Sequence, residues 1–512
     1  MTKDSQQQSD FAALSDADAF YKVGTLIDAS FDARSASGTD QAFLLLDELG
    51  NRHLSADHAA LVHYFRANAW ANREHMQTNP DSWSWEQPEC QAQILELRRA
   101  LRHEGFSQLP VVRKCQIFTN LANQLNKIGR FIEAVETFDR ALDLDAKFGM
   151  ARGNRGIALS HYARALYDGG HAGFMLVAAH DALTSAVQDD AFYEGLGYSP
   201  ALEFFRKEAA NIESHVKIKT IRRSLAGKKY ALGDGEQERR YRSWCLSQRL
   251  FINPLNDLGA LSIAAQDVLT LPSLTVGTAS RGAMPEVIGF FNQIKQEFVS
   301  ARYLYYEGLH AKGIHFSDRD VRLYNTLDYP AYSFAAEKMR ASFRMAYSLF
   351  DKISFFLNHH LQLGHKPKTV SFRSVWYEPK GSPPLPLLSK FVSYRNWPLR
   401  GLFWLSKDLF EEDFKAVTEP DAESLNEMRN HLEHKYLQLH QEMVAPGSSS
   451  LGYSIYKGDF AARTLRLLKR ARAAVIYLSL AVWSEERKRD LNSGRKTTMT
   501  MPLDVWEDEW KR

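Results

Sequence analysis

Residues 429–436, RNHLEHKY, place an arginine, an asparagine and two histidines within six positions. A histidine titrates near neutral pH and can give or take a proton, and an arginine can hold two phosphate oxygens with its planar fork. These residue types suit chemistry on a phosphodiester. The surrounding apolar spacing predicts that they stand on a single helix over 421–443, whose core-facing residues are Leu425, Met428, Leu432, Tyr436 and Leu439.

On such a helix Asn430 and His434 share a face, whereas Arg429 lies about 140° from His434 and reaches it only through its long side chain. Local chemistry alone favours a simpler interpretation, in which Arg429 pairs with Glu433 on the surface and the histidines are solvated. A metal site is a further alternative. Its ligands would be Glu427, His431 and His434, but the H-x-x-H spacing is not that of a zinc helix, and no distant ligand cluster accompanies it. We therefore predict neither a metal nor a cofactor.

Length and composition indicate the class of protein that carries these residues. At 512 residues, two or three domains are expected. With 64 basic and 61 acidic residues, any attraction to nucleic acid must come from local patches. The three cysteines, Cys90, Cys115 and Cys245, form no C-x-x-C pair, which favours a reducing compartment. The N-terminus lacks the apolar core of a signal peptide, and AAVIYLSLAVW (473–483) is too short to cross a membrane. We expect a soluble, cytoplasmic protein with no membrane partner.

Apolar spacing predicts helix along most of the chain, so the expected fold class is all-α. From Phe118 to Ala146, small residues at Ala122, Ala134 and Ala141 alternate with large ones, and Gly129 marks a tight turn between two helices. This order and spacing resemble a tetratricopeptide repeat, whose period is 34 residues. Gly156 begins a second match, whose second helix is expected only at FMLVAAHDALTSAV (174–187).

An earlier helix of the same array is expected in ALVHYFRANAWANREHM (60–76). Stacked repeats would form a curved surface for a protein or peptide ligand, and an ordinary helical bundle is the alternative. The basic run 217–229 could follow an RNA backbone, although a solvated linker is the simpler interpretation. Four long helices are predicted beyond it, around 285–308, 333–363, 421–443 and 459–489, which together suggest an up-and-down bundle.

RNHLEH also fits the R-x4-6-H signature of the HEPN superfamily, and more of the chain resembles its LA2681-like branch. R-x4-H alone is a weak signal, whereas an ordered series of matches is strong. The matching stretches are YRSWCLSQRLFINPLNDLG (241–259), FNQIKQEFVSARYLYYEG (291–308), AYSLFDKISFFLN (346–358), LRGLFWLSKDLF (399–410) and FAARTLRLLKRARAAVIYLSLAVW (460–483).

The resemblance implies a helical bundle, usually dimeric, that cleaves RNA without a metal through attack by the 2′-hydroxyl. It implies His434 as proton-transfer group, Arg429 as phosphate clamp and Asn430 as orienting partner. The second proton-transfer group would come from a homodimer partner, or from His431 of the same chain. The resemblance also implies a toxin or anti-phage effector regulated by its repeats. A non-catalytic module that binds RNA, nucleotide or protein is the alternative, and a dimerising scaffold without nucleic acid is a third.

Further site residues follow from the same resemblance. Asp351, on one side of a helix with Tyr347, Asn358 and Arg340, could orient Arg429 or His434, although a solvated stripe fits equally well. Tyr436 matches R-x4-H-x-Y, whose tyrosine is adenylylated in some HEPN toxins, but its apolar spacing predicts a core tyrosine. A basic helix face could hold RNA phosphates or simply be solvated, and it comprises Arg463, Arg466, Lys469, Arg470 and Arg472.

The predicted domain organisation is a disordered tail at 1–10, a helical-repeat domain at 11–235, a HEPN domain with an N-terminal extension at 236–490, and a C-terminal tail at 491–512. The stretch YRSWCLSQRLFINPLNDLG could belong to either domain.

Overall fold

The computed structural model describes a helical protein, which confirms the all-α prediction. It describes residues 11–77, 83–194, 199–225, 230–275, 286–325, 330–381, 385–411, 414, 425, 428–432, 435–440, 447–448, 451–492 and 501–511. One apolar core runs from α4 to α19, and a smaller core lies among the first three helices. None of the helices in these ranges combines the length and apolar character that crossing a bilayer requires.

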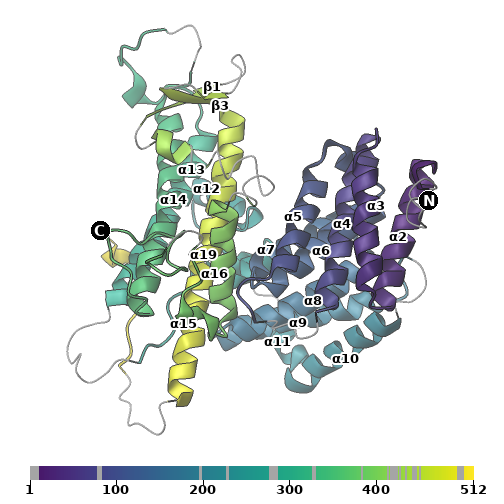
Figure 1. Cartoon of the computed structure of the whole chain (residues 1–512). Helices are drawn as coiled ribbons and strands as arrows, with labels where there is room; N and C mark the ends of the chain where they lie inside the picture. The colour runs from purple at the N-terminus through teal and green to yellow at the C-terminus, as the bar shows by residue number, and fades with distance from the viewer. Residues whose placement is uncertain are drawn as a thin grey trace.

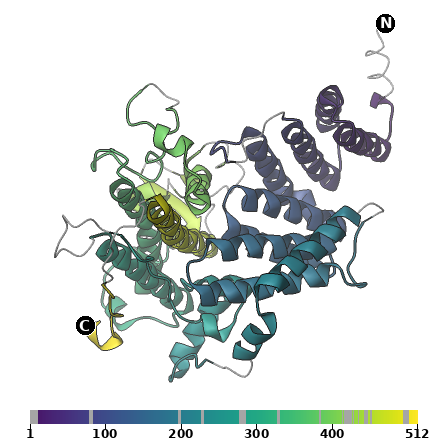
Figure 2. The same ribbon diagram turned by 90° about the horizontal axis from the view of Figure 1, so that it is seen from below.

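The N-terminal half is a row of helices in which each packs against the next. The row curves from α2 to α11, as Figure 2 shows from below. Its helices are α2 Asp16–Asp32, α3 Ala36–Gly50, α4 Ala56–His75, α5 Pro88–Arg102, α6 Val111–Lys127, α7 Phe131–Leu144, α8 Gly149–Ala165, α9 Gly169–Ala186, α10 Ser199–His215 and α11 Ile218–Leu225, with a 3₁₀ turn at Glu104–Gln108. The assignment of these hairpins to the tetratricopeptide family stays a prediction.

Small residues allow these helices to approach closely. Gly129 joins α6 to α7 with φ +89°, which confirms the predicted positive φ. A Cβ on Gly156 would lie 2.6 Å from Cγ of Leu183, so α8 and α9 touch where the second match predicted a small residue. The second helix of that hairpin begins earlier than predicted. α9 starts at Gly169 because the side chain of Asp168 caps it by accepting from the backbone N–H of His171.

The C-terminal half is a bundle of long helices (Figure 1). α13 and α14 pack side by side, and α19 packs against α13, α14 and α16. The elements are α12 Glu236–Ser247, 3₁₀ turns at Pro254–Leu258 and Ser262–Ala264, α13 Glu286–His310, a 3₁₀ turn at Phe316–Asp318, α14 Phe334–His360, α15 Ser389–Val392, α16 Trp397–Phe410, α19 Lys457–Asn492 and a 3₁₀ turn at Asp508–Trp510.

A small sheet lies at one end of this bundle (Figure 1). Its strand order is β1-β3-β2, where β1 is Tyr436–His440, β2 is Gly447–Ser448 and β3 is Gly452–Tyr456. β1 pairs in parallel with β3, and β3 continues directly into α19. The predicted single helix over 421–443 is therefore wrong beyond residue 435. Residues 428–432 are helical, but Tyr436 and Leu439 lie on a strand because β3 offers them a partner edge.

The two halves meet where the turn after α6 touches α16. A Cβ on Gly129 would lie 2.3 Å from the carbonyl oxygen of Trp397, and one on Gly401 would lie 2.3 Å from that of Gly129. Backbone therefore packs on backbone, which only glycine allows at both positions. We call the contact of α5–α8 with α16, α19 and residues 249–257 the joint.

Asp408 of α16 anchors the joint electrostatically. Its carboxylate pairs with Arg98 at 2.8 Å and with Arg130 at 2.5 Å, and Asp408 and Arg130 are both buried. Burial by itself raises the pKa of Asp408, but the two guanidinium groups outweigh it and hold the pKa below its ordinary value.

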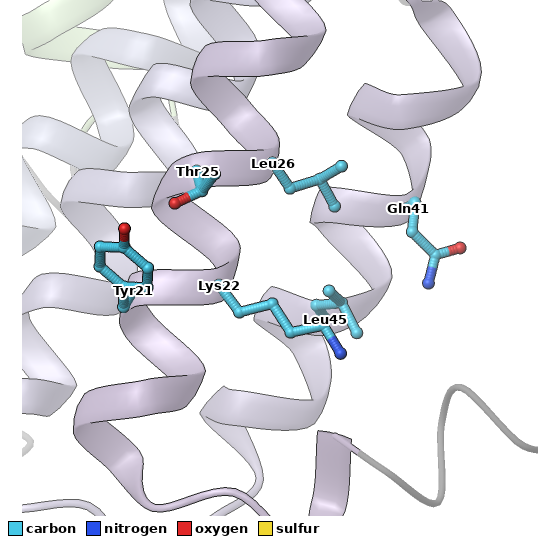
Figure 3. Close-up of a pocket in the computed structure, with 6 residues that line it drawn as sticks. All are labelled: Tyr21, Lys22, Thr25, Leu26, Gln41 and Leu45. Carbon is cyan, nitrogen blue, oxygen red and sulfur yellow. The ribbon is translucent and has the colours of Figure 1, made fainter.

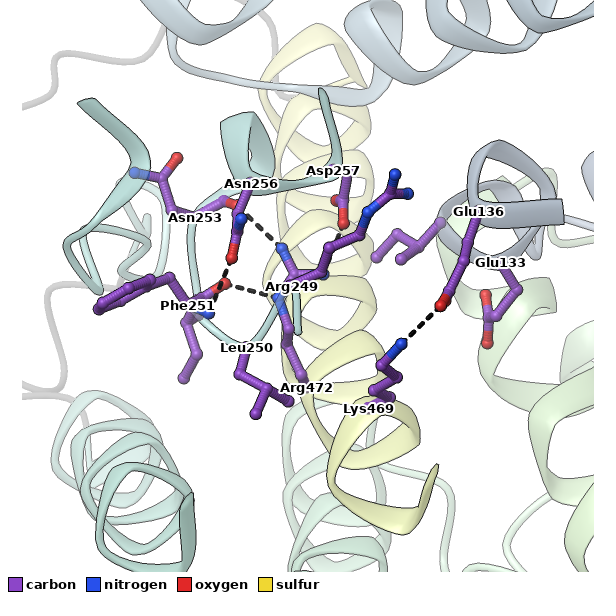
Figure 4. A network of polar contacts seen from close by, with 12 residues as sticks. Glu133, Glu136, Arg249, Leu250, Phe251, Asn253, Asn256, Asp257, Lys469 and Arg472 are labelled. Carbon is purple, nitrogen blue, oxygen red and sulfur yellow. Dashed lines mark hydrogen bonds and ion pairs between the residues drawn. The ribbon is translucent and has the colours of Figure 1, made fainter. Parts of the chain in front are cut away.

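Arg472 of α19 forms a second buried anchor (Figure 4). Its guanidinium donates to Asp257 at 2.6 Å and to the carbonyl oxygens of Phe251 and Asn253. Asp257 also accepts a hydrogen bond of 2.9 Å from Tyr162 of α8. Residues 249–257 thus contact both α8 and α19. They are part of the stretch 241–259, which could belong to either domain by sequence, and they lie between the two halves.

We predict that Asp408→Asn lowers the free energy of unfolding by about 3–5 kcal/mol, because it leaves the buried guanidinium of Arg130 without its main counter-charge. Since the folded-state pKa of Asp408 is depressed, this stabilisation is present above about pH 4 and is lost as the pH falls through the folded-state pKa. Urea unfolding at several pH values measures it. The matched control is Asp47→Asn, which breaks the exposed pair with Arg66 and should cost less than about 1 kcal/mol. Equal effects of the two variants would contradict this account.

Candidate functional site

The motif segment 428–432 is a short helical stretch packed between α14 and α19. Met428 is fully buried, and the backbone N–H of Lys435 donates to the carbonyl oxygen of His431 at 3.1 Å, which turns the chain into β1. His434, Glu433 and Glu427 lie outside the described residues. Among the predicted motif residues, Arg429, Asn430 and His431 have described positions.

Arg429 is half-buried against α14. Its Cζ lies 5.7 Å from the ring centroid of Tyr347, within cation–π range, and its Nη1 donates weakly to Oδ1 of the exposed Asn430 at 3.4 Å. Burial, reinforced by the charge of Asp351 and opposed by Arg429, raises the pKa of Tyr347 to about 12. The guanidinium thus rests on a neutral ring.

Asp351 lies one helical turn beyond Tyr347 and faces the same segment. Burial raises the pKa of its carboxyl, while the backbone N–H of Phe372, 3.4 Å away, and the charge of Arg429 both oppose that rise. The structure therefore brings Arg429, Tyr347 and Asp351 together. That Asp351 orients the site stays a prediction.

Two other residues on the predicted stripe of α14 have separate tasks. Asn358 exchanges two hydrogen bonds with the backbone of His365, at 2.9 and 3.0 Å. Arg340 donates to the carbonyl oxygen of Leu437 at 2.9 Å and pairs with Glu337. These contacts hold the following loop and β1, so neither residue joins the cluster at Arg429.

His431 faces inward. It is only 4% exposed, and its ring centroid lies 5.8 Å from that of Tyr453 on β3. This burial does not suit a second proton-transfer group that must meet a substrate. Packing accounts for the position of His431.

Tyr436 is exposed, so its prediction as a core tyrosine is wrong. Because the chain becomes a strand at this residue, its side chain leaves the apolar stripe that a continuous helix would have kept. Its hydroxyl is hydrogen-bonded to that of Tyr332, which precedes α14.

The basic residues of α19 divide among three environments. Arg463 donates to the hydroxyl of Tyr453 at 3.3 Å and lies 4.0 Å from the sulfur of Met428, so it borders the motif segment. Arg466 is exposed, and Arg470 is half-buried near Asp408, whose pKa it helps to lower. Lys469 and Arg472 belong to the joint, where they pair with Glu136 and Asp257. The expectation of one continuous basic face is therefore wrong for these last two.

Tyr453 is a neighbour that sequence reasoning missed. It lies on β3 between His431 and Arg463, and the alternation in GYSIY (452–456) was the available signal.

Across the parts of the chain that the structure describes, no three His, Cys, Asp or Glu side chains gather in a way that could hold a metal ion.

A separate hollow lies far from this site, at the N-terminal end of the row of helices (Figure 3). It measures about 420 Å³ between α2 and α3 and is lined by Tyr21, Lys22, Thr25, Leu26, Gln41 and Leu45. The residues that line it include no histidine, cysteine or carboxylate, so it lacks the groups typical of a catalytic pocket.

Residues 278–485 match the family model described as LA2681-like HEPN. No solved structure matches the chain. The matched range begins just before α13 and ends within α19, and it includes the motif segment and the sheet.

We predict that Asp351→Asn raises the urea midpoint of unfolding at pH 7. The pKa of Asp351 is higher in the folded protein than in the unfolded protein. The protonated carboxyl therefore stabilises the folded state fully below the unfolded-state pKa, and this stabilisation is lost as the pH rises through the folded-state pKa. The gap between variant and wild type should therefore widen from pH 4 to pH 7. Asp189→Asn, at an exposed position after α9, is the control and should leave the urea midpoint unchanged at both pH 4 and pH 7. A gap that stays constant with pH would count against this interpretation.

Proposed function

Since residues 278–485 are an LA2681-like HEPN domain, we propose that this chain is a metal-independent endoribonuclease whose active site is built around Arg429, Asn430 and His434. The observation that carries the proposal is the position of Arg429. Its guanidinium is steadied by Tyr347 and lies near Asp351, at the surface of the domain that matches the family.

In the proposed reaction, the 2′-hydroxyl of a ribose attacks the adjacent phosphorus. A histidine removes the hydroxyl proton, the bond from phosphorus to the 5′-oxygen breaks, and a protonated group delivers a proton to that oxygen. The products are a 2′,3′-cyclic phosphate and a 5′-hydroxyl. Arg429 stabilises the charge that develops on the non-bridging oxygens, and Asn430 orients the phosphate. The half-buried Asp351 lies close enough to Arg429 for their charges to interact, and we propose that it helps to orient the guanidinium.

The reaction needs two proton-transfer groups, and each chain supplies one suitable histidine. His431 is buried against Tyr453, so it is poorly placed to meet RNA. We therefore propose a homodimer in which His434 of one chain works opposite His434 of the partner subunit. In each cleavage the histidine of one subunit would act as base and that of the partner subunit as acid.

We further propose that residues 11–235 regulate the nuclease, which would act as a toxin or anti-phage effector. The joint supports this view. Buried ion pairs connect Arg98 of α5 and Arg130 at the start of α7 to Asp408 of α16, and a buried hydrogen bond connects Tyr162 of α8 to Asp257. A protein or peptide bound on the row of helices could thus alter the packing of the bundle through elements that it does not touch.

The direct test compares wild type with His434→Ala and Arg429→Ala on mixed RNA in EDTA, followed by end-group analysis. We expect wild type to leave 2′,3′-cyclic phosphate ends. The histidine variant should lose about 10²–10⁴-fold in rate and the arginine variant about 10²–10³-fold.

His359→Ala, at an exposed position near the end of α14, is the matched histidine control and should retain wild-type activity. Cleavage that disappears in EDTA, or that survives in His434→Ala, would overturn the proposed mechanism. Tight RNA binding without any cleavage would favour the non-catalytic binding module instead.

The dimer is tested by mixing wild type with an excess of His434→Ala after partial unfolding and reassembly. If the reaction needs histidines from both subunits, mixed dimers are inactive and activity falls with the square of the wild-type fraction. If one histidine suffices, activity falls linearly, which would contradict the shared site. Mixing with His359→Ala is the control and should leave activity unchanged.

A further inference from the structure

A strip of aromatic side chains is exposed at the sheet end of the bundle. We call it the aromatic strip. It comprises the exposed Phe316, Tyr332, Phe334 and Tyr436, the half-buried His315, and Tyr324, an exposed ring of the same segment as Phe316. Tyr324 is 96% exposed and Phe316 is 74% exposed. Large rings gathered in water at one place on a surface mark a site of interaction.

Ring contacts and a hydrogen bond connect most of the strip. The ring centroids of Phe316 and His315 lie 4.2 Å apart, and those of His315 and Phe334 lie 4.9 Å apart. Tyr332 stands two residues before Phe334 and is hydrogen-bonded to Tyr436. The strip therefore runs from the segment after α13, across the start of α14, to β1.

Backbone contacts hold the strip in place beside the motif segment. The carboxylate of Asp318 accepts hydrogen bonds of 3.0 and 3.1 Å from the backbone N–H of Phe334. The backbone N–H of Ala331 donates to the carbonyl oxygen of Leu439 at 2.6 Å, next to an isolated bridge between Pro330 and His440. Arg429 contacts Tyr347, which lies about 20 Å along α14 from Phe334, so a ligand on the strip must span that distance to meet Arg429.

The charges around the strip favour a polyanion. Lys312, Arg319, Arg322 and Lys435 are exposed, whereas the carboxylate of Asp318 is already engaged in capping α14. Among the described residues, Asp320 of the same segment and Glu337 in the first turn of α14 are exposed acids, and Glu337 pairs with Arg340. Rings that can stack on bases, placed among cations that can meet phosphates, are the combination that binds single strands of nucleic acid.

We propose that the aromatic strip is a binding platform for single-stranded RNA, which delivers an unpaired segment to the site at Arg429. The proposal rests on the proposed function for its substrate class and adds the requirement that the RNA be unpaired, since bases must leave their own stack to lie on these rings. Exposed aliphatic side chains occur in the same segment, at Ile314, Val321 and Leu323, so a second copy of the chain is the competing occupant.

The experiment measures fluorescence anisotropy of a labelled 12-nucleotide RNA carrying 2′-O-methyl groups, which cannot be cleaved through its blocked 2′-oxygens. We expect the full-length Phe316→Ala/Tyr324→Ala variant to bind this strand at least about tenfold more weakly than wild type. Tyr324→Trp, which keeps a stacking surface, should bind like wild type. Tyr21→Ala removes an equally exposed tyrosine from α2 and should have no effect.

Three results would overturn the platform: no binding of the strand by wild type, equal binding by the double variant, or equally strong binding of a blunt duplex. Light scattering on the same samples identifies a second copy as the occupant if the double variant loses mass but keeps its RNA affinity. Binding does not depend on cleavage in this design. If binding depends on the strip but unmodified RNA is not cut, the proposed nuclease activity is wrong and the proposed platform stands. If the double variant cuts RNA normally and binds it like wild type, the platform is wrong and the nuclease activity stands.

Discussion

Buried contacts between arginine and aspartate govern how this molecule is assembled. Asp408 accepts from Arg98 and Arg130, and Asp257 accepts from Arg472, at places where water is almost wholly excluded. A charge buried without its partner costs several kcal/mol, so Asp408 is tolerable only when both halves of the chain are in place. Hydrophobic packing supplies most of the driving force for the continuous core, whereas the ion pairs fix one relative orientation of the row of helices and the bundle.

The same buried contacts connect the proposed regulation by the N-terminal half to the proposed chemistry at Arg429. Arg463 borders the motif segment, and Arg472 is buried in the joint, yet both belong to α19 and are separated by about 14 Å along its axis. β3 enters this helix without a break and carries Tyr453 against His431. A shift of the joint that moved α19 by a fraction of a helical turn would therefore also reposition the surroundings of Arg429. This gives the proposed control by the N-terminal half a physical route.

Helical periodicity predicted the fold class and most of the long helices, because an amphipathic helix leaves its pattern in neighbouring residues. Helix phase, together with the family resemblance, also singled out Asp351, which lies near Arg429. It could not predict β1, since the apolar spacing of Tyr436 and Leu439 suits a helix, and their strand exists only because β3 pairs with them. Nor could it find the pair of Asp257 and Arg472, whose 215-residue separation leaves no local signal.

The contact between Gly129 and Gly401 bears on how such proteins could diversify. A side chain on either glycine would collide with the backbone of the other half. Neither position can therefore change without pushing the two backbones apart. A foreign helical array grafted onto this bundle would need a glycine at the same turn, and carboxylates and arginines matching those of α16 and α19. The row of helices and the bundle are therefore not freely interchangeable modules: exchange between relatives would succeed where the joint is inherited along with the new array.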